Sequence, residues 1–206
     1  MLELNQNILR QVLESADSLS QTHDVAGQGD IDLKPAAVLI PLVERQVGQQ
    51  LDYQLLLTRR AKHLKHHAGQ ISFPGGRKEK SDTNLEYTAL RETFEEIGIS
   101  SSQIRILGKL QPHHTITRYS MTPYVGIIKN QYTLKIDPSE VDEAFEVPFN
   151  FILNPDNHKL ESADFQGQKR FYYTIQYQNY NIWGATARVL VEFSKLVHQH
   201  VRPLTS

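Results

Sequence analysis

Residues 75–99 read GGRKEKSDTNLEYTALRETFEEIGI, a glycine turn followed by a stretch with helical spacing. Thr83 with Glu86 three residues later predicts a capping box at the start of the helix. Gly98 stands where a left-handed residue closes a helix. Small and apolar side chains mostly share one side of this helix: Leu85, Ala89, Leu90, Thr93, Phe94 and Ile97. We also expect Tyr87 and Phe94 to be core residues.

Three glutamates gather on the other side of the same helix. Glu92, Glu95 and Glu96 fall within an arc of roughly 100°. Glu92 and Glu96 are i and i+4 neighbours, a like-charge pair that costs a bare helix about 0.2 to 0.5 kcal/mol. Hard divalent cations bind such clustered carboxylates. A solvated acidic face is the alternative that the glutamates alone leave open.

The segment before the helix, Phe73-Pro74-Gly75-Gly76, is a strand end that runs into a glycine turn. Turn and helix together resemble the Nudix box, G-x5-E-x7-R-E-U-x-E-E-x-G-U, in which U is a bulky apolar residue. Arg91, the three glutamates, Gly98 and Ile99 match this pattern, and Gly76 matches its first glycine. The resemblance favours a metal-binding role for the glutamates over a solvated face.

The match has three departures. Thr93 replaces an aliphatic residue, and Asp82 stands where the pattern has its first glutamate. Eight residues, in place of seven, separate Asp82 from Arg91. Because the extra residue precedes the helix, it affects the role expected of Asp82 and not that of the glutamates.

Size and composition predict one globular domain with or without an extension. The chain has 206 residues, a net charge of -1 and no cysteine. Disulfides and thiolate metal sites are therefore excluded. No apolar run reaches the roughly 18 residues of a membrane span, and the acidic N-terminal stretch is not typical of a secretory signal. We expect a cytoplasmic protein with no membrane association.

The order of periodic segments predicts a mixed sheet flanked by helices. An amphipathic helix runs from Leu4 to Leu19, and Val189 to Val197 mark a C-terminal helix. Strands are expected at 36–43, 53–58, 70–73, 104–110, 122–129, 132–136, 169–176 and 180–183. The Nudix resemblance implies an α/β/α sandwich whose box forms a loop-helix-loop. We place the domain at 31–206, after an N-terminal helical extension at 1–30.

Positive charge is concentrated just before the acidic helix. Between Thr58 and Lys80, seven basic residues accompany one acidic residue, a local charge of +6 in a chain whose total is -1. A polyanion lying across both segments would explain the pattern, because cations would hold its charge and metals would bridge its phosphates. A solvated lysine-rich loop is the alternative. Nucleic acid is disfavoured as a partner, since the whole chain is not basic and aromatic residues do not interleave with the charges.

This basic segment is similar to the signature of coenzyme A pyrophosphatases, roughly L-L-T-x-R-S-x3-R-x3-G-x-V-x-F-P-G-G. Arg60, Gly69 and residues 73–76 match it directly, whereas Ala61 replaces a serine and Lys65 replaces an arginine. Lysine keeps the charge but loses the bidentate fork of arginine. The later stretches PSEVDEAFEVP and IWGATARVL are similar to the same branch.

The resemblance implies a division of labour among the side chains. Glu92 and Glu96 would be the principal Mg²⁺ or Mn²⁺ ligands, and Glu95 would be a further ligand or would reach a metal through water. Arg91 would orient these carboxylates through ion pairs. Substrate binding falls to the glycine turn and the basic residues beside it: Arg59, Arg60, Lys65, Gly75, Gly76 and Arg77.

Glu140 is the candidate for a remote acid that acts as ligand or base, with Glu143 as its competitor. Two histidine groups, 63–67 and 113–114, are expected to make polar loop contacts; a transition-metal site is the alternative.

The reaction that these resemblances imply splits coenzyme A into 4′-phosphopantetheine and adenosine 3′,5′-bisphosphate. ADP-ribose or a dinucleoside polyphosphate is the rival substrate within the enzyme class. A nucleotide-sensing domain without turnover is the rival from another class, disfavoured because Arg91 and the three glutamates are kept. The expected partner is a small nucleotide, and a homodimer is possible.

Overall fold

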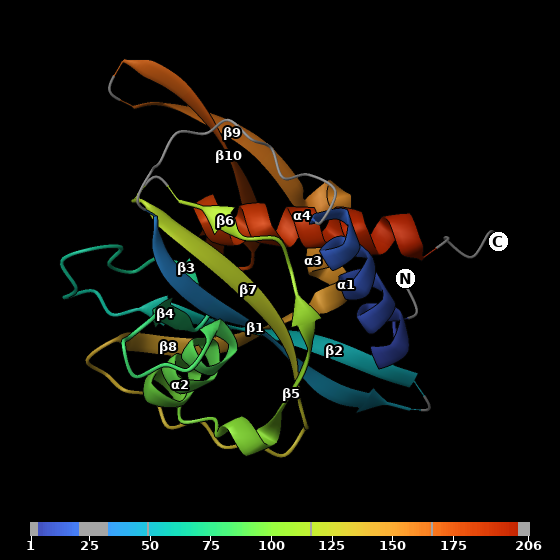
Figure 1. Ribbon diagram of the computed structural model, residues 1–206. Coiled ribbons are helices and arrows are strands. Elements are labelled where there is room, and N and C mark those ends of the chain that lie inside the picture. The colour runs from blue at the N-terminus through green and yellow to red at the C-terminus, as the bar shows by residue number, and fades with distance from the viewer. Residues whose placement is uncertain (1–3, 21–32, 49, 116, 166, 202–206) are drawn as a thin grey trace.

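The computed structural model describes residues 4–20, 33–48, 50–115, 117–165 and 167–201. Its strands form a larger sheet of eight and a smaller sheet of three (Figure 1). The strands of the larger sheet are β1 Lys34–Val47, β2 Gln50–Arg60, β3 Ile71–Ser72, β4 Gly75–Arg77, β5 Ile104–Lys109, β6 His113–His114, β7 Tyr119–Ile128 and β8 Val141–Pro148. Those of the smaller sheet are β9 His158–Phe165, β10 Gln168–Tyr177 and β11 Tyr180–Trp183.

Strand β1 is the centre of the larger sheet. It pairs antiparallel with β2, with Leu42 opposite Leu55, and parallel with β7, with Leu39 opposite Tyr124. It also pairs antiparallel with β4. The sheet is therefore mixed, as the sequence predicts. Backbone pairing with β1 fixes the glycine turn at one end of the sheet.

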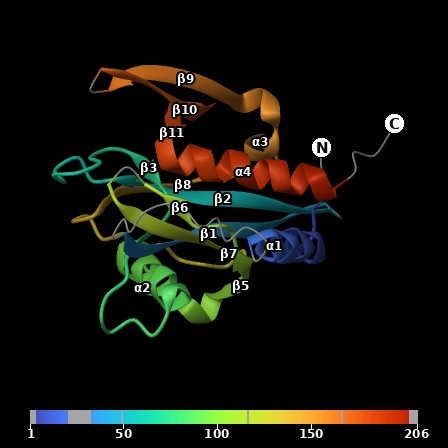
Figure 2. The same cartoon turned by 45° about the horizontal axis from the view of Figure 1, so that its top comes forward.

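Helices cover both faces of this sheet (Figure 2). They are α1 Gln6–Ser20, α2 Leu85–Ile97, α3 Phe149–Leu153 and α4 Gly184–His200, with short 3-10 turns at η1 Ser101–Gln103 and η2 Pro155–Asn157. Helix α2 lies on one face, and α1, α3 and α4 lie on the other. Along β2, Leu56 packs in the core under α2, and Leu55 and Leu57 pack in the core under the other helices. The predicted α/β/α sandwich is confirmed.

The N-terminal helix packs into the larger core. Leu9, Val12 and Leu13 are buried there. A Cβ atom added to Gly108 of β5 would lie 2.9 Å from the Leu13 Cβ, so helix and strand are in close contact. The predicted helix is thus confirmed. The predicted boundary at residue 30 lies outside the described residues, and the division into extension and domain stays a prediction.

The sequence prediction is wrong in several local details. Residues 132–136 form no strand, whereas the strands β8 and β9 and the short helix α3 were not predicted. Tyr87 and Phe94 are not core residues, because 49% and 57% of their surfaces are exposed. Both side chains point toward solvent. Glu96, which the sequence predicts on the acidic face, is buried instead.

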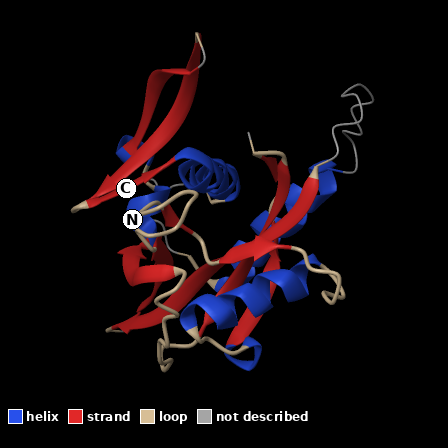
Figure 3. Ribbon diagram, turned by 90° about the vertical axis from the view of Figure 1, so that its left-hand side faces the viewer, coloured by secondary structure: helices blue, strands red, loops and turns tan. Residues whose placement is uncertain are grey.

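The smaller sheet lies at one end of α4. Its β10 and β11 strands pair from Thr174–Trp183 to Tyr177–Tyr180, which confirms the predicted hairpin. The β9–β10 hairpin extends away from the larger sheet (Figure 3). Ile175 of β10 and its partner Ile182 of β11 are buried with α4 in the larger core.

Among the described residues, no helix is both long and apolar enough to cross a membrane.

Leu13→Ala tests whether α1 is part of the domain core. We expect the free energy of unfolding to fall by about 2 to 5 kcal/mol, because a fully buried leucine is removed from a packed contact. Gln11→Ala, at an exposed position of the same helix, is the control and should stay within about 0.5 kcal/mol of the parent. Chemical denaturation measures both. Equal stability of the two variants would contradict the integration of α1 into the core.

Candidate active site

Helix α2 begins one residue later than the sequence predicts. Asn84, not Thr83, is the N-cap: its backbone is extended and its side-chain oxygen accepts a hydrogen bond of 2.7 Å from the Tyr87 N–H. Asparagine is a stronger N-cap than threonine. The predicted capping box with Glu86 is therefore wrong.

The end of α2 is closed as predicted, by Gly98 in the left-handed conformation with φ 75°. The chain at 135–137 crosses this end, and its N–H groups bond the last helical carbonyls: Lys135 to Ile97 at 2.9 Å and Asp137 to Glu96 at 3.0 Å. Residues 132–136 are not a strand because their backbone satisfies helix carbonyls in place of strand partners. This contact also carries the chain on to Glu140.

The glycine turn presses against the helix. At Gly76 an added Cβ would lie 2.5 Å from the Glu92 carboxylate, and at Gly75, where φ is 149°, it would lie 2.5 Å from the carbonyl oxygen of Ala37. Neither position has space for a side chain. The two glycines let β4 pair with β1 and meet the acidic helix at once.

Asp82 and Arg91 form a buried ion pair that joins the loop to the helix. The Asp82 Oδ1 accepts from Arg91 Nε at 2.9 Å, and Oδ2 accepts from the second guanidinium nitrogen at 3.0 Å. Oδ2 also accepts from the Thr88 hydroxyl at 2.9 Å and the Glu79 N–H at 2.8 Å. The side chain of Asp82 has no exposed surface. Hydrogen bonds from Arg91 hold the pKa of Asp82 well below its ordinary value of 3.8. Asp82 therefore joins the loop to helix α2 through Arg91. This is the role of Asp82 that the extra residue before Arg91 had left open.

The same guanidinium reaches two of the three glutamates. Arg91 lies 2.7 Å from the Glu95 Oε2 and 3.0 Å from the Glu92 Oε1. Burial raises the pKa of Glu92, and the charge of Arg91 partly offsets this. Arg91 therefore contacts the carboxylates as the sequence predicts.

Glu96 is the most buried of the three glutamates, with 2% of its surface exposed. Burial raises the pKa of its carboxyl to about 8, against the opposing charge of Arg60 and with a further increase from Glu92 and Glu140. The Gly75 backbone in turn lowers this pKa. One oxygen of the carboxylate, Oε2, is buried and has no hydrogen-bond partner. A buried acceptor of this kind calls for a cation or water that binds it.

Arg60 and Glu140 join this group from other strands. Arg60 ends β2, and its Nε is buried without a partner. Glu140 precedes β8, where its carbonyl accepts from the Ala61 N–H at 2.9 Å, and its charge raises the pKa of both Glu92 and Glu96. The structure thus gathers Glu92, Glu95, Glu96, Arg60, Glu140 and the two glycines at one end of the sheet.

Other predicted site residues lie elsewhere or have no partner. The guanidinium of Arg59 lies 3.5 Å from the Glu143 Oε2 and 5.1 Å from the centre of the Tyr180 ring. Glu143, the competitor of Glu140, is therefore engaged with these residues. Lys65 and Arg77 are exposed. In the first histidine group, His63 Nε2 lies 3.1 Å from the Ser139 carbonyl and His67 Nδ1 lies 2.7 Å from the Gln70 Oε1, which are polar loop contacts. The second group, His113 and His114, forms strand β6 in place of the predicted loop.

Residues 33–166, more than half of the chain, match the protein-family model of the NUDIX domain. The chain belongs to the Nudix hydrolase family. It is 38% identical over 162 residues to an uncharacterized Nudix hydrolase, NudL, of Yersinia pestis (strain Pestoides F), with 79% of each chain covered. NudL of Yersinia pseudotuberculosis serotype O:1b (strain IP 31758) gives the same values.

Two solved structures are less similar in sequence. The Nudix hydrolase RenU of M. smegmatis superposes with a TM-score of 0.48 at 19% identity, over 57% of this chain and 71% of that one. The NUDIX domain of Shewanella oneidensis NrtR, solved with ADP ribose, gives a TM-score of 0.43 at 19% identity, over 67% and 85%.

As a Nudix hydrolase the protein cleaves a nucleoside diphosphate linkage in a small nucleotide, and this family generally uses divalent ions such as Mg²⁺ or Mn²⁺. The unpartnered Glu96 oxygen and the neighbouring carboxylates form an oxygen-only donor set that fits such a hard cation. Within the described part of the chain, no three acidic or histidine side chains already converge as a ligand set.

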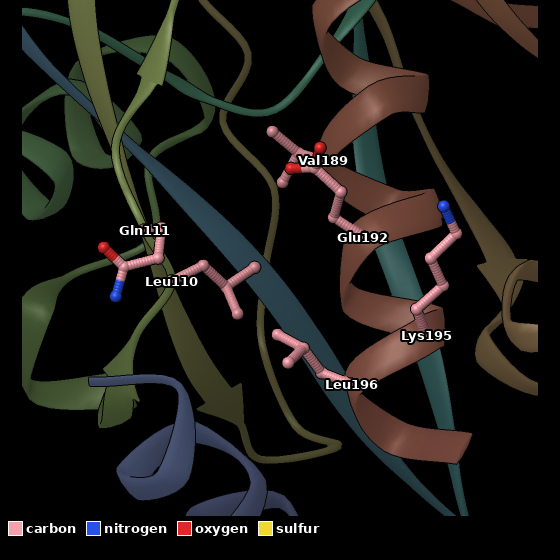
Figure 4. A pocket seen from close by; sticks show the side chains of 6 residues that line it. All are labelled: Leu110, Gln111, Val189, Glu192, Lys195 and Leu196. Atoms are coloured by element: carbon pink, nitrogen blue, oxygen red, sulfur yellow. The ribbon is translucent and has the colours of Figure 1, made fainter. Parts of the chain in front are cut away.

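A separate hollow of about 240 Å³ lies between α4 and the chain that follows β5 (Figure 4). Leu110 faces Val189 and Leu196 across it, and Gln111, Glu192 and Lys195 complete its lining. None of the site residues of this Nudix hydrolase lines the hollow.

Asp82→Ala tests the ion pair that carries the site. It leaves Arg91, Thr88 and the Glu79 N–H without their buried acceptor, so we expect a loss of about 3 to 5 kcal/mol in the free energy of unfolding at neutral pH. Because the pKa of Asp82 is lower in the folded state than its ordinary value of 3.8, this stabilisation is complete above that pH and declines below it.

The difference between parent and Asp82→Ala should therefore shrink as the pH falls below about 4. Asp164→Ala, which removes an exposed carboxylate of β9, is the control and should stay within about 0.5 kcal/mol of the parent. Urea unfolding at several pH values measures all three proteins. A pH-independent difference would show that the charge of Asp82 is not what stabilises the fold.

Proposed function

We propose that this Nudix hydrolase splits coenzyme A or its derivatives into 4′-phosphopantetheine and adenosine 3′,5′-bisphosphate. One observation carries the proposal: near the start of the basic segment, the partly buried Arg60 has an Nε without an acceptor, and its charge acts on Glu96, whose Oε2 is also buried without a partner. A phosphate between them would supply the acceptor to Arg60 and share a cation with Glu96. The local charge of +6 suits a substrate with a third phosphate beyond its diphosphate.

The metal would be held by Glu92 and Glu96, with Glu95 as a further ligand. When bound, it neutralises charge on the diphosphate and makes a bound water more acidic. Arg91 keeps the carboxylates oriented, since Asp82 fixes its guanidinium from the other side. Glu140, whose charge acts on Glu92 and Glu96, is our choice of remote acid over Glu143, which is engaged with Arg59 and Tyr180. It would serve as a ligand or as the base that accepts a proton from water.

The glycine turn and the basic residues beside it provide the substrate contacts. Because Gly75 and Gly76 carry no side chain, their backbone can approach the phosphates, and Arg60 holds one of them. Lys65 and Arg77 are exposed and free to reach the 3′-phosphate of the nucleotide. Their contacts are more open to solvent than that of Arg60, so added salt should weaken them more.

Glu96→Gln tests the metal assignment. The amide keeps the volume of the carboxylate but removes its charge, and a neutral group costs less to bury. We expect activity to fall by about 100-fold or more while thermal stability without metal stays equal or rises. Glu86→Gln, on the first turn of the same helix, is the matched control and should keep full activity. An active Glu96→Gln enzyme would remove Glu96 from the ligand set.

The substrate proposal is tested by comparing coenzyme A, 3′-dephospho-coenzyme A, ADP-ribose and a dinucleoside polyphosphate with Mg²⁺ and with Mn²⁺. We expect coenzyme A to have the highest kcat/KM. A charge-assisted contact with the 3′-phosphate contributes about 1.5 to 3 kcal/mol, or roughly 10- to 150-fold. Lys65→Arg should maintain or increase this preference, because it restores a bidentate fork.

Preference for ADP-ribose over both coenzyme A forms would contradict the proposed substrate but not the assignment as a Nudix hydrolase. Binding of all four nucleotides without product would favour a sensing domain.

A further inference from the structure

Arg59 and Arg60 are adjacent in the sequence, but their side chains lie on opposite faces of the larger sheet. Successive strand residues point to opposite faces. Arg60 acts on Glu96 under α2, whereas Arg59 lies against Tyr180, which packs on the core under α4. The pairing of β2 with β8 shifts between them: Arg59 lies opposite Glu143 and Arg60 opposite Val141. This irregularity leaves one extra residue on β8, and such a bulge changes the direction of the strand beside the site.

Four side chains form a closed cluster behind this irregularity. The Tyr180 hydroxyl donates to the Glu143 Oε1 at 2.6 Å, and the Arg59 guanidinium lies 3.5 Å from Oε2 of the same carboxylate. The ring of Tyr180 stacks on that of Phe145, with centres 3.6 Å apart and planes within 7°. The cluster therefore links β2, β8 and β11 through charge, hydrogen bonding and stacking.

The backbone carries this link directly to the site. One residue after Arg59, the Arg60 N–H donates to the Gln70 carbonyl and its own carbonyl accepts from Gly69, at 2.9 and 3.0 Å. The next amide, that of Ala61, donates to the Glu140 carbonyl at 2.9 Å. The backbone positions of Arg60 and Glu140 are thus fixed by hydrogen bonds at the two residues that follow Arg59 in the chain.

We propose that Arg59, Glu143 and Tyr180 are positioning residues that aim Arg60 and Glu140 at the carboxylate site. Arg59 acts through Arg60 and does not contact the substrate. The contacts of Arg59 support this role, since its guanidinium is engaged on the face away from Glu96. The inference rests on the proposed function for the roles of Arg60 and Glu140, but the structural link it describes does not depend on which nucleotide is cleaved.

The test is a double-mutant cycle of Arg59→Ala and Arg60→Ala, measured as kcat/KM on the preferred nucleotide of the substrate panel. We expect Arg59→Ala alone to lower kcat/KM by about 10- to 100-fold, because misplacement of a binding group is costly. In the Arg60→Ala background the same change should cost less than about threefold, since the group it positions is gone. Arg59→Lys should recover part of the loss through its charge.

The chain offers a matched control at the other end of β8. There Arg45 pairs with Glu146, and the Tyr132 hydroxyl donates to the Glu146 Oε1 at 2.6 Å. Arg45→Ala removes the same type of side chain from the same type of trio, far from Glu140 in the strand. It should leave kcat/KM within about twofold of the parent, since it breaks a partly exposed ion pair with Glu146 and hydrogen bonds to Asn130, contacts that involve no residue of the site.

Amide hydrogen exchange gives a readout that needs no substrate. Arg59→Ala should accelerate exchange at Arg60 and Ala61, and Arg45→Ala should not. Additive kinetic effects of Arg59→Ala and Arg60→Ala would instead make Arg59 a direct substrate contact and overturn the proposal. Unchanged exchange at both amides would overturn it as well. Failure of the coenzyme A assignment appears separately, in the substrate panel.

Discussion

The buried ion pair between Asp82 and Arg91 is the interaction on which the site depends. One carboxylate satisfies a guanidinium, a hydroxyl and a backbone N–H, so it fixes the loop, the first turns of α2 and the middle of that helix together. Such a pair stabilises the fold only because every donor around the carboxylate is matched in geometry. The same guanidinium then reaches Glu92 and Glu95 from a fixed position. Local charge repulsion among the glutamates is thereby reduced in the protein without metal.

Glu96 has the opposite character. Its carboxylate is buried with one oxygen unpartnered. The charges of Glu92 and Glu140 raise its pKa further, and the charge of Arg60 offsets this only in part. Burial without full pairing is costly, and such cost concentrates at functional sites. Asp82 and Glu96 therefore divide two tasks: the first stabilises the fold, and the second retains an unsatisfied group for a ligand. A divalent ion at Glu96 would also stabilise the folded state by mass action.

The two faces of the larger sheet also have different roles. Helix α2 and the glycine turn bring the acids together on one face. On the other face, Arg59, Glu143, Phe145 and Tyr180 tie the ends of β2 and β8 to the smaller sheet. An irregularity in strand pairing lies between the two groups, which lets a contact on one face set a direction on the other. Residues that pack behind a functional group hold it within the narrow range of geometry that its chemistry requires.

The sequence by itself determined the elements that depend on local pattern. The acidic helix, its closure at Gly98, the amphipathic α1, the central strands and the α/β/α class all follow from periodicity, turn residues and the resemblance of residues 75–99 to the Nudix box. These features are short-range, since caps and periodic faces are set by residues a few positions apart. Asn84 shows the limit, because two neighbouring polar residues compete for one cap and the sequence pattern favoured Thr83.

Only the tertiary structure decided the features that join distant segments. Residues 132–136 read as a strand but bond to the end of α2, and Phe94 reads as core but lies toward solvent. Adjacent Arg59 and Arg60 read as one basic patch, yet alternation along β2 sends them to opposite faces. Arg59 meets Glu143 and Tyr180, which are 84 and 121 positions away in the chain, and the charge of Arg60 acts on the acidic helix. The physical reason is the same in each case: charge, burial and pairing depend on which segments meet in space, and no local pattern contains that information.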